Sequence, residues 1–178
     1  MENSIKSIAK NYGTYLGGLL ALLTVLVYAV SLDMMTNMWY GIFILLLIVV
    51  FGIVSVAKTK GESEGYISFK QSFTAYFITI LIGLVISTLV SYVIFNIIDP
   101  EAANILKEKS IETMISFMEG FGAPPDSIAE AVDKMENDNQ FSIANILMSL
   151  AGHLVIFSII GLIVAAIMKN TNPEENKM

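Results

Sequence analysis

The amino-acid sequence predicts an all-α membrane protein with four transmembrane helices and a small extracytoplasmic helical segment between spans three and four. Hydrophobic residues make up 55% of the 178 residues and charged residues only 15%. A soluble domain usually carries about 25% charged residues. Four apolar stretches are long enough for a helix to cross a bilayer, and none of them contains Asp, Glu, Lys or Arg.

The four predicted spans form a single domain that covers residues 1–178. We expect them at about residues 14–32, 39–57, 73–98 and 143–168. The first stretch also has features of a signal peptide, because Lys6 and Lys10 precede it. It is longer than the roughly 7–15 apolar residues of a signal-peptide core. We therefore interpret it as an uncleaved span.

The lysines indicate the orientation of the spans. All ten basic residues are lysine, and seven of them flank spans one to four on one side: Lys6, Lys10, Lys58, Lys60, Lys70, Lys169 and Lys177. Lys107, Lys109 and Lys134 lie on the other side, among ten acidic residues between Asp99 and Asp138. Because cytoplasmic loops carry the excess of lysine, we expect both termini in the cytoplasm and the acidic segment outside.

Capping signals predict where two of the helices begin. Ser68 and Gln71 have the spacing of a capping box, in which each side chain accepts a hydrogen bond from the other residue's backbone N–H. The helix of span three should therefore begin near Ser68. Its end is expected at Asp99, because the following proline disfavours helical backbone in the residue before it.

The segment of about residues 99–140 is predicted to form two helices, separated by the sequence GFGAPP. Apolar residues recur at helical spacing on both sides of this break. Ser127 and Glu130 again have capping-box spacing, which predicts the start of the second helix. About forty residues bury little core alone. Their apolar faces must therefore rest on the bundle, on the lipid interface or on another protein.

One polar cluster is expected inside the bilayer. His153 is the only histidine and lies within the apolar sequence AGHLVIFSII. Counting along the spans places Tyr28, Ser87, Thr88 and Ser91 at a similar depth. Such a cluster could bind a ligand or relay a proton, because ionisable groups inside membranes are often functional. No carboxylate lies inside a span, so we favour a hydrogen bond from His153 between spans.

Small residues recur every four positions in three of the spans. They are Gly13, Gly17 and Ala21 in span one, Gly83, Ser87 and Ser91 in span three, and Gly161 and Ala165 in span four. Such rows allow helix backbones to approach closely. We expect them to close this bundle rather than to join two copies of the chain.

Several function classes are disfavoured by composition. The chain has no arginine and a net charge of −6, which argues against nucleic-acid binding. It has no cysteine, and the acidic segment lacks the residue pattern of a calcium-binding loop. No catalytic motif or metal-binding motif is present, so we expect neither an enzyme nor a cofactor.

A pattern over nearly the whole chain resembles a known family. Its marks are a lysine-bearing N-terminus, two closely spaced spans, the sequence GYISFKQSF that opens span three, an outer helical segment and a final span. These features resemble the bacterial domain-of-unknown-function family number 4199, which comprises small four-span proteins without assigned activity. The resemblance implies a protein of the bacterial inner membrane and supplies no catalytic residues.

Two functions are compatible with these features. The first is a structural or interaction component of the bacterial envelope, which would bind a membrane-protein partner or a second copy in addition to the lipid bilayer. The alternative is a small transporter or lipid-handling protein that works as an oligomer and uses a groove near His153, Tyr28 and Ser91. The sequence favours the first, because substrate pathways usually contain charged groups or broken helices.

Overall fold

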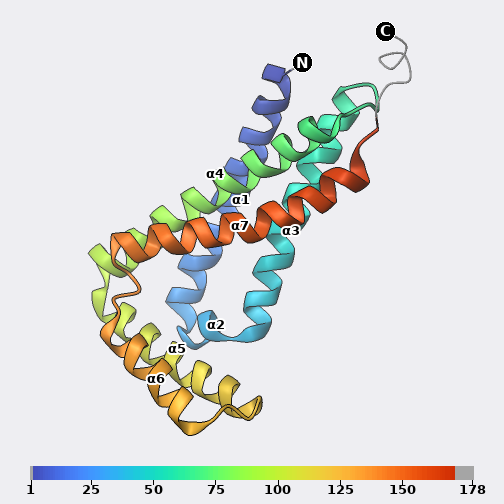
Figure 1. The fold of residues 1–178 in the computed structure, drawn as a ribbon. Helices are drawn as coiled ribbons and strands as arrows, with labels where there is room; N and C mark the ends of the chain where they lie inside the picture. Colours follow the sequence, from blue (N-terminus) through green and yellow to red (C-terminus); the bar gives the residue numbers. More distant parts are fainter. Residues whose placement is uncertain (1, 171–178) are drawn as a thin grey trace.

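The structure, a computed structural model, describes residues 2–170. Its elements, in chain order, are α1 (Glu2–Val30), α2 (Asp33–Thr36), α3 (Met38–Glu62), α4 (Phe69–Val93), the π-helical turn η1 (Ile94–Ile98), α5 (Pro100–Gly120), α6 (Pro125–Asn137) and α7 (Ile143–Met168) (Figure 1). Helices therefore account for most of this range, as the all-α prediction requires.

Four helices are long and apolar enough to cross a membrane, which confirms the four-span prediction. They cover Asn3–Val30, Met38–Glu62, Phe69–Ile98 and Ile143–Met168. The end of the bundle where α1 begins and α7 ends is here called the lysine end. The opposite end, where α5 and α6 form a helical hairpin, is called the hairpin end (Figure 1). At the lysine end, α1 and α3 extend well beyond the predicted apolar stretches.

Helix α4 lies at the centre of the bundle and packs against α1, α3 and α7. Its contact with α1 is close because both helices present glycine there. A Cβ atom at Gly17 would lie 2.6 Å from Cβ of Ile86, and a Cβ atom at Gly83 would lie 2.6 Å from Cδ2 of Leu16. Both distances are shorter than van der Waals contact, so a larger residue would push the two backbones apart.

Tyr76 holds α4 against α3 and α7. Its ring is fully buried. A Cβ atom at Gly52 of α3 would lie 2.4 Å from Cε2 of the ring, and one at Gly161 of α7 would lie 2.6 Å from Cδ1. The ring therefore occupies space that glycine provides on both neighbouring helices. The Tyr76 hydroxyl has no hydrogen-bond partner among residues 2–170.

A small network of hydroxyl groups joins three spans. The Thr79 hydroxyl of α4 lies 2.7 Å from the Ser55 hydroxyl of α3 and 3.2 Å from the Ala9 carbonyl of α1. Thr79 and Ser55 are both fully buried. A hydrogen bond between spans contributes about 0.6 kcal/mol on average. The centre of the bundle thus combines close packing with uncharged hydrogen bonds.

At the lysine end, the loop between α3 and α4 is joined to the end of α7. The backbones of Ile67 and Asn170 exchange two hydrogen bonds of 2.8 Å. Lys60 Nζ donates to the Met168 carbonyl at 3.2 Å. Ser68 and Gln71 form the predicted capping box at the start of α4. These contacts hold three of the spans together at this end.

At the hairpin end, α5 turns back across the bundle towards α2 (Figure 1). Asp99 caps α5 by accepting a hydrogen bond of 3.0 Å from the Ala102 N–H, and Lys109 forms an ion pair with Asp33 of α2. This ion pair lowers the pKa of the Asp33 carboxyl and raises that of Lys109. Among the helices of residues 2–170, α6 packs only against α5.

The capping box predicted at Ser127 is wrong. Helix α6 begins at Pro125, and no side chain within residues 2–170 caps it. Proline favours the first helical position, since its φ angle is already helical and its missing N–H is not needed there. Ser127 therefore lies inside the first turn instead of preceding it.

A lateral groove and an adjoining polar cleft

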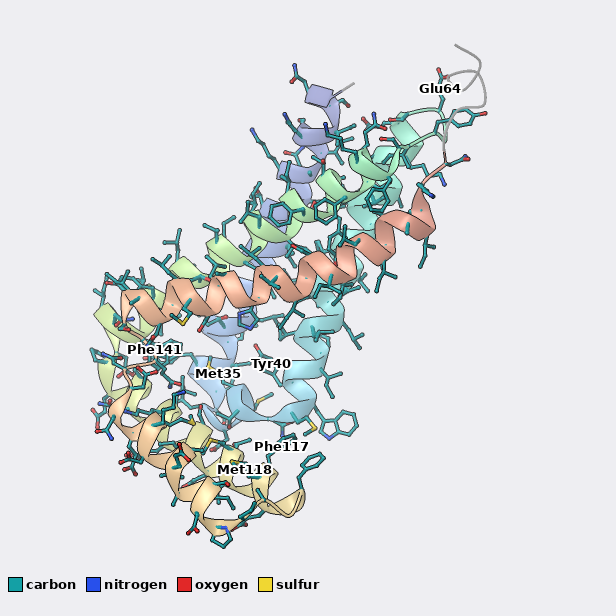
Figure 2. All side chains as sticks on the ribbon, in the orientation of Figure 1. Met35, Tyr40, Glu64, Phe117, Met118 and Phe141 are labelled. Atoms are coloured by element: carbon teal, nitrogen blue, oxygen red, sulfur yellow. The ribbon has the colours of Figure 1, made fainter. Side chains whose placement is uncertain are left out.

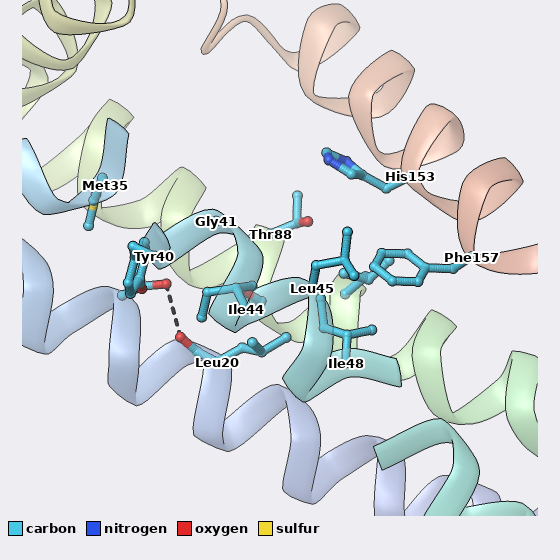
Figure 3. Close-up of a pocket in the computed structure, with 13 residues that line it drawn as sticks. Leu20, Met35, Tyr40, Gly41, Ile44, Leu45, Ile48, Thr88, His153 and Phe157 are labelled. Atoms are coloured by element: carbon cyan, nitrogen blue, oxygen red, sulfur yellow. Dashed lines mark hydrogen bonds between the residues drawn. The ribbon is translucent and has the colours of Figure 1, made fainter. Parts of the chain in front are cut away.

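A groove opens between α3 and α7 in the half of the bundle near the hairpin end. Gly52, Gly161 and Tyr76 bring these two helices together, and beyond this contact they diverge (Figure 1). The resulting cavity has a volume of about 440 Å³, which is within the range of about 300–1,000 Å³ for small-molecule sites. Its apolar walls come from all four spans: Leu20, Ile44, Leu45, Ile48, Leu84 and Phe157 (Figure 3).

A second cavity of about 190 Å³, here called the polar cleft, lies between α4 and α7. It shares Leu84, Ser87, Thr88 and His153 with the groove. Its other walls extend towards the hairpin end and combine the polar Ser91, Tyr92, Gln140 and Ser149 with the apolar Phe141, Ile146 and Leu150. The two cavities therefore form one site with a largely apolar lining, in which most of the hydroxyl and amide side chains gather between α4 and α7.

His153 lies where the groove and the polar cleft meet. Its side chain is exposed, and Figure 3 shows the imidazole projecting from α7 over the cavity, on the side of Thr88. No hydrogen bond joins this ring to another side chain or backbone group within residues 2–170. The hydrogen bond that we expected between spans is therefore not formed, and both ring nitrogens remain accessible from the site.

The structure brings together only part of the polar cluster expected from the sequence. His153, Ser87 and Ser91 all line the polar cleft. Tyr28 lines neither cavity and instead donates a hydrogen bond of 2.8 Å to Asp99 Oδ2. The Ala102 N–H, followed by the Tyr28 hydroxyl, lowers the pKa of the Asp99 carboxyl. Tyr28 thus helps to fix the start of the hairpin.

The glycines of the small-residue rows lie at close contacts between the spans. Gly13 and Gly17 contact α4, Gly83 contacts α1, and Gly161 contacts Tyr76; Ala165 is fully buried and Ala21 is half-buried.

The structure adds two residues to the site that the sequence analysis did not identify. Gly41 lines the groove and has no described atom within 4 Å of its Cβ position, and Gln140 lines the polar cleft. No sequence pattern distinguishes either of them.

The site lacks side chains that carry a fixed charge. Among residues 2–170, no Asp, Glu, Lys or Arg lines the groove or the polar cleft. Within the part of the chain that the structure describes, no three His, Asp or Glu side chains gather where a metal ion could be held. The site therefore offers apolar surface, hydroxyl groups and an imidazole, which suit the binding of an amphipathic molecule.

Comparison with known proteins places the chain in one family. No curated protein and no solved structure matches it. A family model described as "Protein of unknown function (DUF4199)" matches residues 11–170. This region contains all four predicted spans, the hairpin and every residue that lines the groove or the polar cleft. The chain therefore belongs to the DUF4199 family, as its sequence features indicated.

Proposed function

We propose that this protein binds an amphipathic lipid, which reaches the groove sideways from the bilayer. The observation that carries the proposal is a single site in which an apolar groove adjoins a cleft that gathers hydroxyl groups and His153, set between helices long and apolar enough to cross a membrane. Of the two functions compatible with the sequence, this arrangement favours lipid handling. The proposal assigns binding to the groove and involves no catalytic step.

Contacts at the hairpin end support a lateral route. Met35 of α2 lines the groove at this end. It also packs against a buried cluster formed by η1 and the start of α5, which includes Phe95 and Leu106. The groove is therefore bounded towards the hairpin, while α3 and α7 diverge along its side (Figure 1). A molecule dissolved in the bilayer meets the open side directly.

We further propose that the lysine end faces the cytoplasm of a bacterial cell, with the protein in the inner membrane. Six lysines at or near this end support the assignment: Lys6, Lys10, Lys58, Lys60, Lys70 and Lys169. Lys177 lies outside the described residues. The positive-inside rule places such an end in the cytoplasm.

Cysteine labelling tests this orientation, because the natural chain has no cysteine. A Ser127→Cys variant should react with a membrane-impermeant maleimide in intact spheroplasts, since α6 is then outside. A Ser63→Cys variant, in the loop at the lysine end, should react only after permeabilisation. The opposite labelling pattern would reverse the assignment.

Native mass spectrometry of protein extracted gently from its own membranes tests the lipid-binding proposal. We expect one bound lipid per chain. Replacing Gly41 with phenylalanine fills the groove from α3 and should reduce lipid affinity at least about tenfold, a change of about 1.4 kcal/mol. Gly152→Phe is the matched control, because Gly152 of α7 also has open space at its Cβ position but lines neither cavity.

Two results would count against the groove as the lipid site. One is a chain that carries no lipid at any detergent concentration that preserves the fold. The other is bound lipid that Gly41→Phe and Gly152→Phe displace equally, since the lipid would then lie on the outer surface of the bundle.

The structural or interaction role remains the second candidate function, and the hairpin favours it. Phe117 of α5 and Phe121, which directly follows this helix, are 52% and 79% exposed, and their rings contact each other at 4.7 Å between centroids. Figure 2 shows Phe117 near the end of α5. A second protein or a second copy of the chain, retained in the same mass spectra in place of lipid, would support this role.

A further inference from the structure

We propose that the site selects lipids whose head group is uncharged and carries a hydroxyl, in preference to lipids with an ionised phosphate. Diacylglycerols and long-chain alcohols belong to the favoured class. This inference rests on the proposed lipid-binding function and adds the chemistry of the ligand. In the bound state the tail lies in the groove and the head group lies in the polar cleft.

The apolar part of the site cannot provide this selectivity. A lipid tail that moves from the bilayer into the groove exchanges one apolar environment for another. The hydrophobic effect therefore contributes little to binding, for the same reason that it does not drive helix association in membranes. Discrimination between lipids must come from the head group and the polar cleft.

The hydroxyl groups of the polar cleft are free to bind a ligand. Several other hydroxyls in the spans donate to the carbonyl four residues earlier: Thr14 to Lys10, Thr24 to Leu20, Thr59 to Ser55 and Ser158 to Leu154. In contrast, Ser87, Thr88, Ser91 and Tyr92 make no side-chain hydrogen bond within residues 2–170. Unpaired polar groups at membrane depth are costly, and a head group that both donates and accepts hydrogen bonds would satisfy them.

Charge disfavours a phosphate head group in the same place. Ionised phosphate is usually bound by Lys or Arg, and no such residue of the described chain lines the polar cleft. Two lysines of α5 are engaged elsewhere, since Lys109 pairs with Asp33 and Lys107 donates to the Glu136 carbonyl at 2.6 Å. The hairpin carries an excess of acidic residues. A phosphate in the polar cleft would therefore lack a lysine or arginine partner.

His153 lies at the position where the head group of such a lipid joins its tail, because it lines both parts of the site. A neutral imidazole has one donor and one acceptor nitrogen. It can therefore bind either oxygen of a glycerol ester, or an alcohol. A lysine at this position would instead introduce the positive charge that a phosphate requires.

The test is a competition between two lipids with identical tails. Full-length protein in detergent is mixed with equal concentrations of dioleoylglycerol and dioleoyl phosphatidate, and the first bound lipid is identified by native mass spectrometry. We expect dioleoylglycerol to bind about tenfold more tightly than dioleoyl phosphatidate. One buried polar group left without a hydrogen-bond partner commonly lowers affinity by about this factor. His153→Lys should reverse the preference, whereas His153→Gln, which retains a donor and an acceptor, should preserve it.

The outcomes separate this inference from the function on which it rests. Saturable one-to-one binding with equal or greater affinity for phosphatidate would overturn the head-group selectivity and leave lipid binding intact. A His153→Lys variant that folds normally and keeps the original preference would also overturn it. If neither lipid forms a saturable complex, both the selectivity and the proposed lipid-binding function fail.

Discussion

Replacing Gly52 with alanine is expected to destabilise the bundle by about 1–3 kcal/mol, the usual cost of adding atoms to a well-packed core. The new Cβ atom would lie 2.4 Å from the ring of Tyr76, which is fully buried and cannot move into open space. Gly41→Ala on the same helix provides the control. No described atom lies within 4 Å of its Cβ position, and alanine favours helix over glycine by about 1 kcal/mol.

The two variants should therefore shift stability in opposite directions. Reversible unfolding in mixed micelles, followed by circular dichroism, measures both free energies. Tyr76→Leu should partly rescue Gly52→Ala, because residues in contact have non-additive effects. Equal stability of the two glycine variants would show that α3 and α4 are not in close contact at Gly52.

Replacing Tyr76 with alanine should destabilise the bundle more than Gly52→Ala does, with a loss of about 3–5 kcal/mol. The ring fills the space between Gly52 and Gly161 and contacts two helices besides its own. The neighbouring Gly52 and Gly161 have no side chains that could fill the cavity left when the Tyr76 ring is removed. The angle between α3 and α7 should also change, because the ring that separates the two glycines would be lost.

Tyr76→Phe separates the contribution of the ring from that of the hydroxyl. The hydroxyl is buried and has no partner among residues 2–170, so its removal should leave stability unchanged or raise it. The same unfolding measurement compares both variants with the natural chain. A clear loss of stability in Tyr76→Phe would contradict this, since it would mean that the hydroxyl forms a favourable interaction in the membrane.

The spans and the start of α4 could be predicted from the sequence because their causes are local. Long apolar stretches without charge require helices in a bilayer, and Ser68 with Gln71 completes a capping box over four residues. The short helix α2 and the turn η1 could not be predicted. Each spans five residues or fewer, too few for a periodic pattern.

The candidate site was only partly predictable, because its shape depends on contacts between distant residues. The groove exists since α3 and α7 meet at Tyr76 and diverge beyond it. Counting residues along the spans identified His153, Ser87 and Ser91, which do share a cavity. The same counting misplaced Tyr28, because it ignores how the spans are turned relative to one another and how Asp99 lies beside α1.

The central position of α4 has a consequence for biosynthesis. During translation, α1 and α3 leave the insertion machinery before α4, yet the glycines at positions 17 and 52 contact α4 side chains. Until α4 is inserted, Gly17 and Gly52 lack the α4 side chains against which they pack. Lipid then covers the helix surface at these two glycines. Helix α7 comes last and packs against a Tyr76 ring that α4 has by then supplied. The bundle can therefore be completed only after α4, the third span, has been inserted. The order of the helices along the chain thus makes assembly a late event in the synthesis of this protein.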